Sequence, residues 1–142
     1  MTGVQTCALP IFKVVTPDGV VFRHETASLV VLDTINGEEG IMANHAPIIT
    51  SLHIGEVKVI NEEENFQENI TISGGFAEFS ENQLSIVSDS AERTQDIDVK
   101  RAEQAKERAE KHIAAGDTDD VERAQAALMR AVNRIHAVTG NK

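Results

Sequence analysis

The stretch 96-DIDVKRAEQAKERAEKHIAAGDTDDVERAQAALMRAVNRIHAV-138 decides how this chain is organised. In its second half, small and apolar residues recur every three or four positions, which places them on one face of a helix. These residues are Val121, Ala124, Leu128, Ala131, Ile135 and Val138. A thinner stripe lies upstream and consists of Val99, Ala102, Ala105, Ala109 and Ile113. Between the stripes, Ala115, Gly116 and Asp117 supply a helix stop and a new N-cap, so two helices are predicted to fold back as an antiparallel hairpin.

The seam of this hairpin is rich in alanine, so the two helices can approach closely but bury little area. At about 25 cal/mol per Å² of apolar surface, such a hairpin is marginal alone. We therefore expect it to depend on a partner or a ligand for stability.

Short apolar segments separated by turn residues fill the chain before the hairpin. The turns include Pro17-Asp18-Gly19 and Asn36-Gly37, both strong turn signals. The expected strands are 12–15, 20–22, 28–32, 57–60, 69–73, 76–79 and 84–87, ending near Asp89. Many short strands at this spacing predict an antiparallel sandwich or barrel followed by helices, an α+β chain.

The first eleven residues, MTGVQTCALPI, show neither strand alternation nor a helical period. They resemble a translated sequencing adaptor more than a native start, and we expect 1–11 to be a non-native leader outside the fold. Cys7, the only cysteine, lies in this segment and has no partner for an internal disulfide.

The charge of the chain is unevenly placed. Its formal net charge is -10, and residues 1–91 carry all of it, with 13 acidic and 3 basic side chains, whereas residues 92–142 hold 10 of each. An acidic body without Trp or Tyr argues against nucleic acid as a partner. No apolar run approaches the roughly 20 residues of a spanning helix, so we expect a soluble, cytoplasmic protein without membrane insertion.

Catalytic and metal motifs are missing from the sequence. The five histidines and one cysteine form no H-x-x-x-H or C-x-x-C pattern, which argues against zinc. The Glu62-Glu63-Glu64 run is expected to be a solvated turn rather than a metal site. Without a G-x-x-x-x-G-K-[ST] loop the chain should not hydrolyse ATP by itself, and Gly74-Gly75 is expected to be a turn or bulge.

Three motifs together resemble the epsilon subunit of the bacterial rotary ATP synthase. They are the G-x-x-G-I-x-x-x-H-x-P pattern at 37–47, Gly74-Gly75-Phe76, and Ala91-Glu92-Arg93, which we expect to open the helical tail. The resemblance runs from about Val14 to Ile135, nearly the whole of the expected native chain. It implies a β-sandwich over residues 12–94 and a regulatory hairpin over residues 95–142.

The resemblance also implies partners and a location. The sandwich would dock on the gamma subunit and the c-ring, and the extended hairpin would reach the alpha and beta subunits and inhibit ATP hydrolysis. The rotor contacts are expected in the 37–47 segment, interpreted as a structured loop, at Glu38, Gly40 and His45; the alternative for His45 is a turn histidine bonded to backbone. Such a protein lies peripherally on the cytoplasmic face of the plasma membrane and requires no cofactor.

A regulatory ATP site is a further expectation. In some bacterial epsilon subunits a segment like Ile97-Asp98-Val99-Lys100-Arg101-Ala102 belongs to such a site. Helical spacing puts Arg101 and Arg108 on one face of the first helix and Arg130 and Arg134 on one face of the second. The four guanidiniums could converge on a polyanion, with Asp98 or Glu92 accepting from adenine or ribose. The alternative is that these arginines pair with local acids such as Glu103 and Glu122.

Three functional hypotheses remain open at this point. The first is a non-catalytic subunit that couples rotor to catalytic core and restrains hydrolysis. A small nucleotide hydrolase would need a nucleophile and base, or a metal site, that the sequence does not offer. A β-sandwich adaptor with a dimerising helical hairpin, unrelated to ATP synthesis, fits the composition as well as the first hypothesis.

Overall fold

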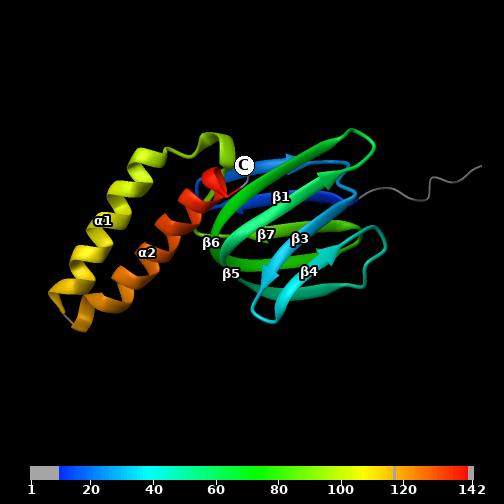
Figure 1. Ribbon diagram of the computed structural model, residues 1–142. Helices are drawn as coiled ribbons and strands as arrows, with labels where there is room; N and C mark the ends of the chain where they lie inside the picture. The colour runs from blue at the N-terminus through cyan, green and yellow to red at the C-terminus, as the bar shows by residue number, and fades with distance from the viewer. Residues whose placement is uncertain (1–9, 117, 141–142) are drawn as a thin grey trace, which may run out of the picture. The chain divides into compact units, whose positions relative to one another are not determined.

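The computed structural model describes residues 10–116 and 118–140 (Figure 1), and they form two compact units that divide between Arg93 and Thr94. The expected N-cap Asp117 and most of the expected leader, residues 1–9, lie outside the described residues. The first unit contains the strands and the second contains the helices, so the α+β class is confirmed.

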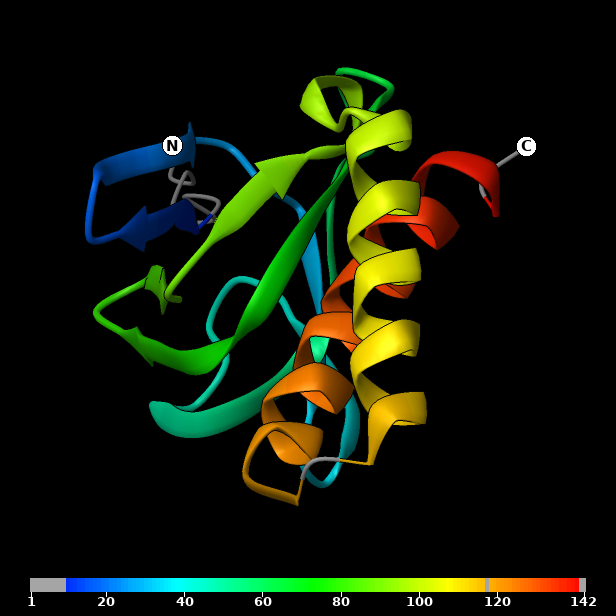
Figure 2. The ribbon, with the colours of Figure 1, turned by 90° about the vertical axis from the view of Figure 1, so that its left-hand side faces the viewer.

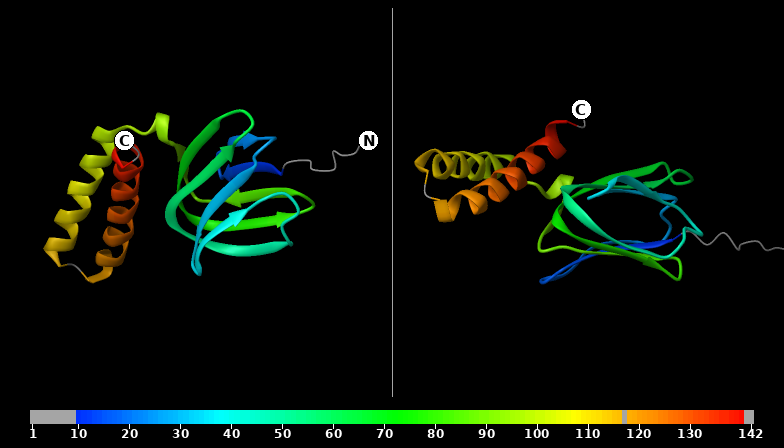
Figure 3. Two further views of the ribbon diagram at one scale, coloured as in Figure 1. Left: turned by 45° about the vertical axis from the view of Figure 1, so that its right-hand side comes forward. Right: turned by 90° about the horizontal axis from the view of Figure 1, so that it is seen from below.

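The first unit is one eight-stranded mixed sheet that forms a β-sandwich, and Figure 3 shows its strands wrapping around a common interior. The strands are β1 (Ile11–Thr16), β2 (Gly19–His24), β3 (Leu29–Thr34), β4 (Gly37–Ile41), β5 (Ile48–Asn61), β6 (Phe66–Ser80), β7 (Gln83–Val87) and β8 (Ala91–Arg93). Their order is β2-β1-β7-β6-β5-β3-β4, with β8 pairing beside β6. One pair, β1 with β7, is parallel, a departure from the purely antiparallel pattern expected from the short connections.

The long central strands differ from the expected short ones. β6 runs without interruption through the segment between the two strands expected at 69–73 and 76–79, and β5 begins nine residues before the strand expected at Val57. The two pair antiparallel in a single register from Ile48 opposite Phe79 to Asn61 opposite Phe66.

Gly74 and Gly75 explain why the sequence suggested a break there. Both have positive φ, +81° and +123°, yet they lie inside β6 and are neither a connecting turn nor a bulge in the β5–β6 register. A Cβ on Gly75 would lie 2.0 Å from the carbonyl oxygen of Val87, so only glycine fits at this point.

Three further expectations at the ends of elements are wrong. Gly37–Ile41, interpreted as loop, is the edge strand β4, because a two-residue turn at Ile35 and Asn36 pairs it with β3 and turns Ile41 into the core. Ala91–Arg93, expected to open the helical tail, is β8, paired with Ile70–Ile72 of β6. The first strand begins at Ile11, which pairs with Gln83, one residue inside the segment we had excluded.

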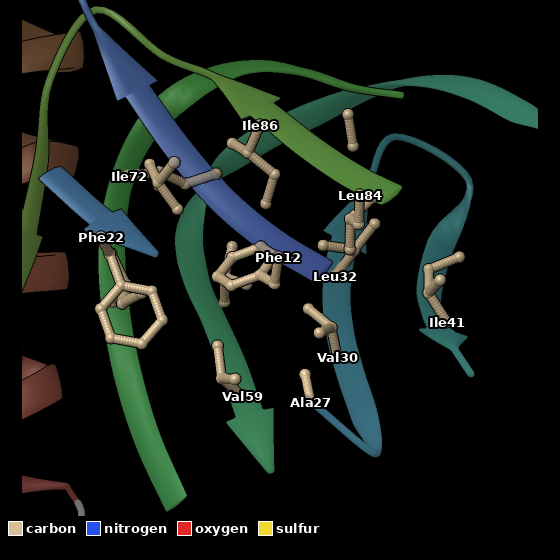
Figure 4. Packing of buried hydrophobic residues seen from close by; sticks show 14 of the residues in the cluster. Phe12, Phe22, Ala27, Val30, Leu32, Ile41, Val59, Ile72, Leu84 and Ile86 are labelled. Atoms are coloured by element: carbon tan, nitrogen blue, oxygen red, sulfur yellow. The ribbon is translucent and has the colours of Figure 1, made fainter. Parts of the chain in front are cut away.

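The core of the sandwich follows from alternation along the strands. In β1, Phe12 and Val14 point inward while Lys13 and Val15 do not, and the same alternation buries Val30 and Leu32 of β3. Figure 4 shows Phe12, Val30 and Leu32 in one cluster with Leu84, Ile86 and Val59 of other strands. The buried apolar set provides a core independent of the helices.

The last strand of the sandwich is held by a charged pair. The Arg93 guanidinium donates from Nε and Nη2 to the two carboxylate oxygens of Glu68, the second bond measuring 2.9 Å. The Arg93 guanidinium carbon also lies 5.5 Å from the centroid of the Phe22 ring. Bidentate geometry and a stacked ring fix the end of β8 against β6 and β2.

The second unit begins with a 3-10 turn, η2 (Thr94–Asp96), and continues into α1 (Val99–Ala115) and α2 (Thr118–Thr139). Figure 2 shows the two helices side by side and running in opposite directions, so the predicted hairpin is confirmed. Gly116, with φ +71°, ends α1 and donates its N–H to the Ile113 carbonyl, as a C-terminal glycine does. Within the described residues, no helix is long and apolar enough to cross a membrane.

Candidate functional site in the helical hairpin

The seam between α1 and α2 is made of alanine. The fully covered positions of the two helices are Ala102, Ala109, Ala124, Ala131 and Ala137. The larger residues of the predicted stripe, Leu128, Ile135 and Val138, are only half-buried. Ala137 is also buried, but six residues after Ala131 it lies on a different face of α2 from the seam. The expectation of close helices with little buried area therefore describes this unit.

Asp98, predicted to accept from adenine or ribose, caps α1. Its backbone is extended, and its side chain accepts from the Arg101 N–H at 3.1 Å. This bond occupies one carboxylate oxygen in a structural role and leaves the other for a ligand. Ile97 precedes the cap and closes the 3-10 turn through its N–H to the Thr94 carbonyl.

The four predicted arginines occupy different settings. Arg101 and Arg108 are exposed on α1, whereas Arg130 and Arg134 of α2 are half-buried. Arg108 donates from Nε to the Gln104 carbonyl at 3.4 Å. Among the described residues, Arg101, Arg108 and Arg130 form no ion pair with Glu103, Glu122 or any other acid.

Two further predicted site residues have different settings. Ala102, next to Arg101 on α1, is buried in the seam, where its small side chain permits close approach of the helices, and a contact with a ligand remains a prediction. Glu92 belongs to β8 in the sandwich, with its carbonyl accepting from the Thr71 hydroxyl. Whether Glu92 joins the arginines remains a prediction.

A groove of about 430 Å³ lies between α1 and α2, and of the four arginines it contains only Arg108. Ala105, Arg108, Ala109 and His112 line it from α1, and Asp120, Arg123, Ala124 and Ala127 line it from α2. Sequence reasoning missed Arg123, His112 and Asp120. A sequence signal for these residues was present. The lining residues of α1 and those of α2 each recur every three or four positions, so each set forms a stripe along one face of its helix.

The predicted rotor residues lie at one edge of the sandwich. Glu38 and Gly40 are exposed in β4, opposite Asp33 and Val31 of β3. His45 follows in a turn: its Nδ1 lies 2.7 Å from the Ala46 carbonyl oxygen and its Nε2 lies 3.5 Å from a carboxylate oxygen of Glu39. The ring also meets the edge of Phe79, with centroids 5.8 Å apart, so His45 is a turn histidine whatever else it does.

The outer face of the sandwich carries a row of apolar residues, three of them exposed and the fourth, Val15, half-buried. Four neighbouring strands place them directly opposite one another: Val20 opposite Val15, Val15 opposite Val87, and Val87 opposite Phe76. Val20 is 61% exposed, Phe76 60% and Val87 55%. We call Val15, Val20, Phe76 and Val87 the apolar row, and contiguous exposure of this kind marks an interaction surface.

Fold and site together define a two-part protein, a β-sandwich with an apolar row on its outer face and a helical hairpin with a groove lined by basic residues. Two family models match the chain: the ATP synthase delta/epsilon chain beta-sandwich domain over residues 11–94, and the delta/epsilon chain long alpha-helix domain over residues 95–139. The chain belongs to the ATP synthase delta/epsilon chain family.

Individual relatives agree with this assignment. The chain is 50% identical over 134 residues to the ATP synthase epsilon chain of Lacticaseibacillus casei, covering 91% of this chain and 93% of the relative. It is 52% identical over 128 residues to that of Ligilactobacillus salivarius, covering 87% and 91%. A chain in the cryo-EM structure of Euglena gracilis mitochondrial ATP synthase (OSCP/F1/c-ring) shares the fold, with a TM-score of 0.77, 24% identity and coverage of 89% and 79%. Family membership excludes the adaptor unrelated to ATP synthesis.

Proposed function

We propose that this chain works in the central stalk of an F-type ATP synthase, where its sandwich docks on the gamma subunit and the c-ring and its hairpin restrains ATP hydrolysis. Membership of the family makes it a non-catalytic epsilon-type subunit of a complex for ATP synthesis and proton transport. The observation that supports the proposal is that both family models match in sequence order, so the chain has both the β-sandwich domain and the helical domain of the family. Its proposed location is peripheral, on the cytoplasmic face of the plasma membrane.

The apolar row supports docking of the sandwich on gamma. The row presents one Phe and three Val side chains on the outer face of the sandwich. A partner protein can bury this apolar surface without any rearrangement of the sandwich core. Phe76→Asp places a charge at the β6 end of this row, on its largest side chain, and should reduce co-purification of the chain with gamma. Lys58→Asp is the control, because Lys58 is exposed on β5 outside the row, and this variant should still co-purify with gamma. Val31→Asp would not serve, because Val31 is half-buried and the change could destabilise the fold.

The edge formed by β4 and the following turn supports a contact with the c-ring. Its exposed Glu38 and Gly40 and its rigid His45 turn present polar groups on a short, paired strand. Glu38→Ala together with His45→Ala should lower ATP synthesis driven by a proton gradient while assembly with gamma persists. If the rate of ATP synthesis is unchanged in the double variant, this edge does not contact the c-ring functionally and serves only to connect β3 with β5.

The hairpin supports regulation by ATP. We propose that Asp98, Arg101, Arg108, Arg130 and Arg134, with Glu92, Ile97 and Ala102 beside them, hold ATP on the folded hairpin, and that low ATP releases the helices toward the alpha and beta subunits. A ligand that binds one state shifts the balance by RT ln(1 + [L]/Kd), about 2.7 kcal/mol at 100 times Kd, enough to control a bistable element. The alanine seam keeps the competing states close in energy.

Calorimetric titration of the isolated chain with ATP tests this regulation. Arg101→Ala and Arg130→Ala should each weaken binding, and hydrolysis by the assembled enzyme should then respond less to ATP. If both variants bind ATP as tightly as the parent chain, these arginines are surface residues and the sensor fails.

A further inference from the structure

Two adjacent glutamates at the edge of the sandwich lie on opposite sides of β4. Ile41 is fully buried, and alternation along the strand puts Glu39 on the same side as Ile41 and Glu38 on the other side. Glu38 is exposed, whereas Glu39 is half-buried at the margin of the core, opposite the buried Leu32 of β3. A carboxylate in this position loses part of its hydration, and a partner has to offset that loss.

His45 is the partner of Glu39. Its Nε2 lies 3.5 Å from a carboxylate oxygen of Glu39, and the two side chains are only 26% and 32% exposed, so water screens the pair in part. Its Nδ1 lies 2.7 Å from the Ala46 carbonyl oxygen. Both ring nitrogens therefore face oxygen atoms, and only a doubly protonated ring can donate to both of them. Together with the edge contact to Phe79, these neighbours fix the ring on three sides.

The backbone of His45 belongs to the turn that follows β4. Its N–H donates to the Met42 carbonyl at 3.2 Å, and Asn44 within this turn has φ +65°, a conformation that Asn adopts more readily than most residues. The Glu39–His45 pair therefore ties the turn back to the strand that carries Glu38. Without the pair the turn can reorient while the β3–β4 ladder stays intact.

We propose that Glu39 is a positioning residue of this edge: its carboxylate holds the His45 ring, and so keeps the turn and Glu38 in the orientation that contacts the c-ring. The inference rests on the proposed c-ring contact and adds a residue that acts through His45 without touching the partner. Two adjacent residues of the same chemistry then have different roles, Glu38 outward in the contact and Glu39 inward in support of it.

A second histidine and glutamate in the sandwich are arranged differently and serve as the comparison. His24 accepts from the Thr26 N–H at its Nδ1, 3.2 Å away, and its Nε2 lies 3.8 Å from a carboxylate oxygen of Glu64. With Nδ1 as an acceptor, this ring donates from Nε2 alone. Glu64 follows β5 whereas His45 precedes it, so the comparison pair lies beyond the opposite end of that 14-residue strand.

The test measures ATP synthesis driven by a proton gradient in assembled enzymes that carry variants of this chain, normalised to the amount of co-purifying gamma. Glu39→Gln should lower synthesis about two- to fivefold, the effect of losing a partly exposed ion pair. Glu39→Asp should lower it less. Gln keeps the shape of Glu and Asp keeps its charge, so this order distinguishes an ion pair from simple packing. Glu64→Gln is the matched control and should keep the parent rate.

A double variant identifies the residue through which Glu39 acts. Glu39→Gln combined with His45→Ala should lower synthesis no further than His45→Ala alone, because the carboxylate then has no ring to hold. In the isolated full chain, the NMR shifts of the His45 ring nitrogens should change in Glu39→Gln and stay unchanged in Glu64→Gln. Circular dichroism of each variant establishes that the sandwich is folded.

The outcomes separate this inference from the proposal beneath it. If Glu39→Gln keeps the parent rate while His45→Ala lowers it, the c-ring contact stands and the positioning role of Glu39 is overturned. Effects that add in the double variant, or a loss in Glu39→Asp larger than that in Glu39→Gln, also overturn it. If neither Glu38→Ala nor His45→Ala lowers synthesis, the c-ring contact itself fails and the positioning role fails with it, even where the NMR shifts show the pair to be formed.

Discussion

Replacing Gly75 with alanine should severely destabilise the sandwich. The residue has φ +123°, a conformation that costs a residue with a Cβ about 1–3 kcal/mol. Its new methyl group would also lie 2.0 Å from the Val87 carbonyl oxygen, so β6 and β7 would have to separate by more than 1 Å. Losing one or two ladder bonds adds about 1 kcal/mol each, for a total of about 2–5 kcal/mol.

Gly19→Ala is the matched control for this prediction. Gly19 has nearly the same φ, +124°, but an added Cβ there has nothing within 4 Å. Gly19→Ala therefore reports the strain alone, and the loss of stability in Gly75→Ala should exceed it by about 1–2 kcal/mol. Because the chain lacks Trp and Tyr, urea and thermal unfolding are best followed by circular dichroism. At about 4–8 °C per kcal/mol, Gly75→Ala should lower the Tm by more than about 8 °C. If the two variants are equally destabilised, the clash with Val87 has no energetic weight.

Three further perturbations test the helix cap, the charged pair and the independence of the sandwich. Asp98→Ala should cost the hairpin about 1 kcal/mol, seen as lower helical content, whereas Asp98→Ser should keep the cap and lose only ligand binding; a defect shared by both would contradict a capping role. Arg93→Met should destabilise the sandwich by leaving the Glu68 carboxylate unpaired, and Glu68→Met in the same chain should recover much of the loss, so a double variant no better than the single one would argue against the pairing. A chain ending after Thr94 should fold and still bind gamma, since β8 is complete, and an unfolded product would show that the helices contribute to the sandwich core.

The sequence pattern predicted the strands in which buried apolar residues alternate with outward-facing residues. It missed the strands that lack this alternation. β1 alternates Phe12 and Val14 with outward residues, which is a clear signal. β4 has only Ile41 facing the core, and its preceding Glu-Glu-Gly has low strand propensity; pairing with β3 alone makes it a strand. Gly74-Gly75 resembled a turn because positive-φ glycines usually end strands, and only the β5–β6 register reveals that β6 continues.

The candidate site was also predictable only in part, according to whether a feature depends on one helix or on the packing of two. Helical spacing placed Arg101 and Arg108 on α1 correctly, since the period depends on the backbone alone. The hollow at Arg123 depends on which alanines face each other across the hairpin, and so on the offset between α1 and α2. That offset is a tertiary property that no single-helix pattern contains.

Arg93 has a consequence for motion. Arg93 is the last residue of β8, where it pairs with Ile70 of β6, and its side chain bonds Glu68 and stacks on Phe22. The chain is therefore held in the sandwich as far as Arg93. Any swing of the hairpin then rotates about the few bonds between Thr94 and Asp98, because α1 is capped directly afterwards. A hairpin released as proposed above would therefore turn about this short segment, and the strands of the sandwich would stay paired.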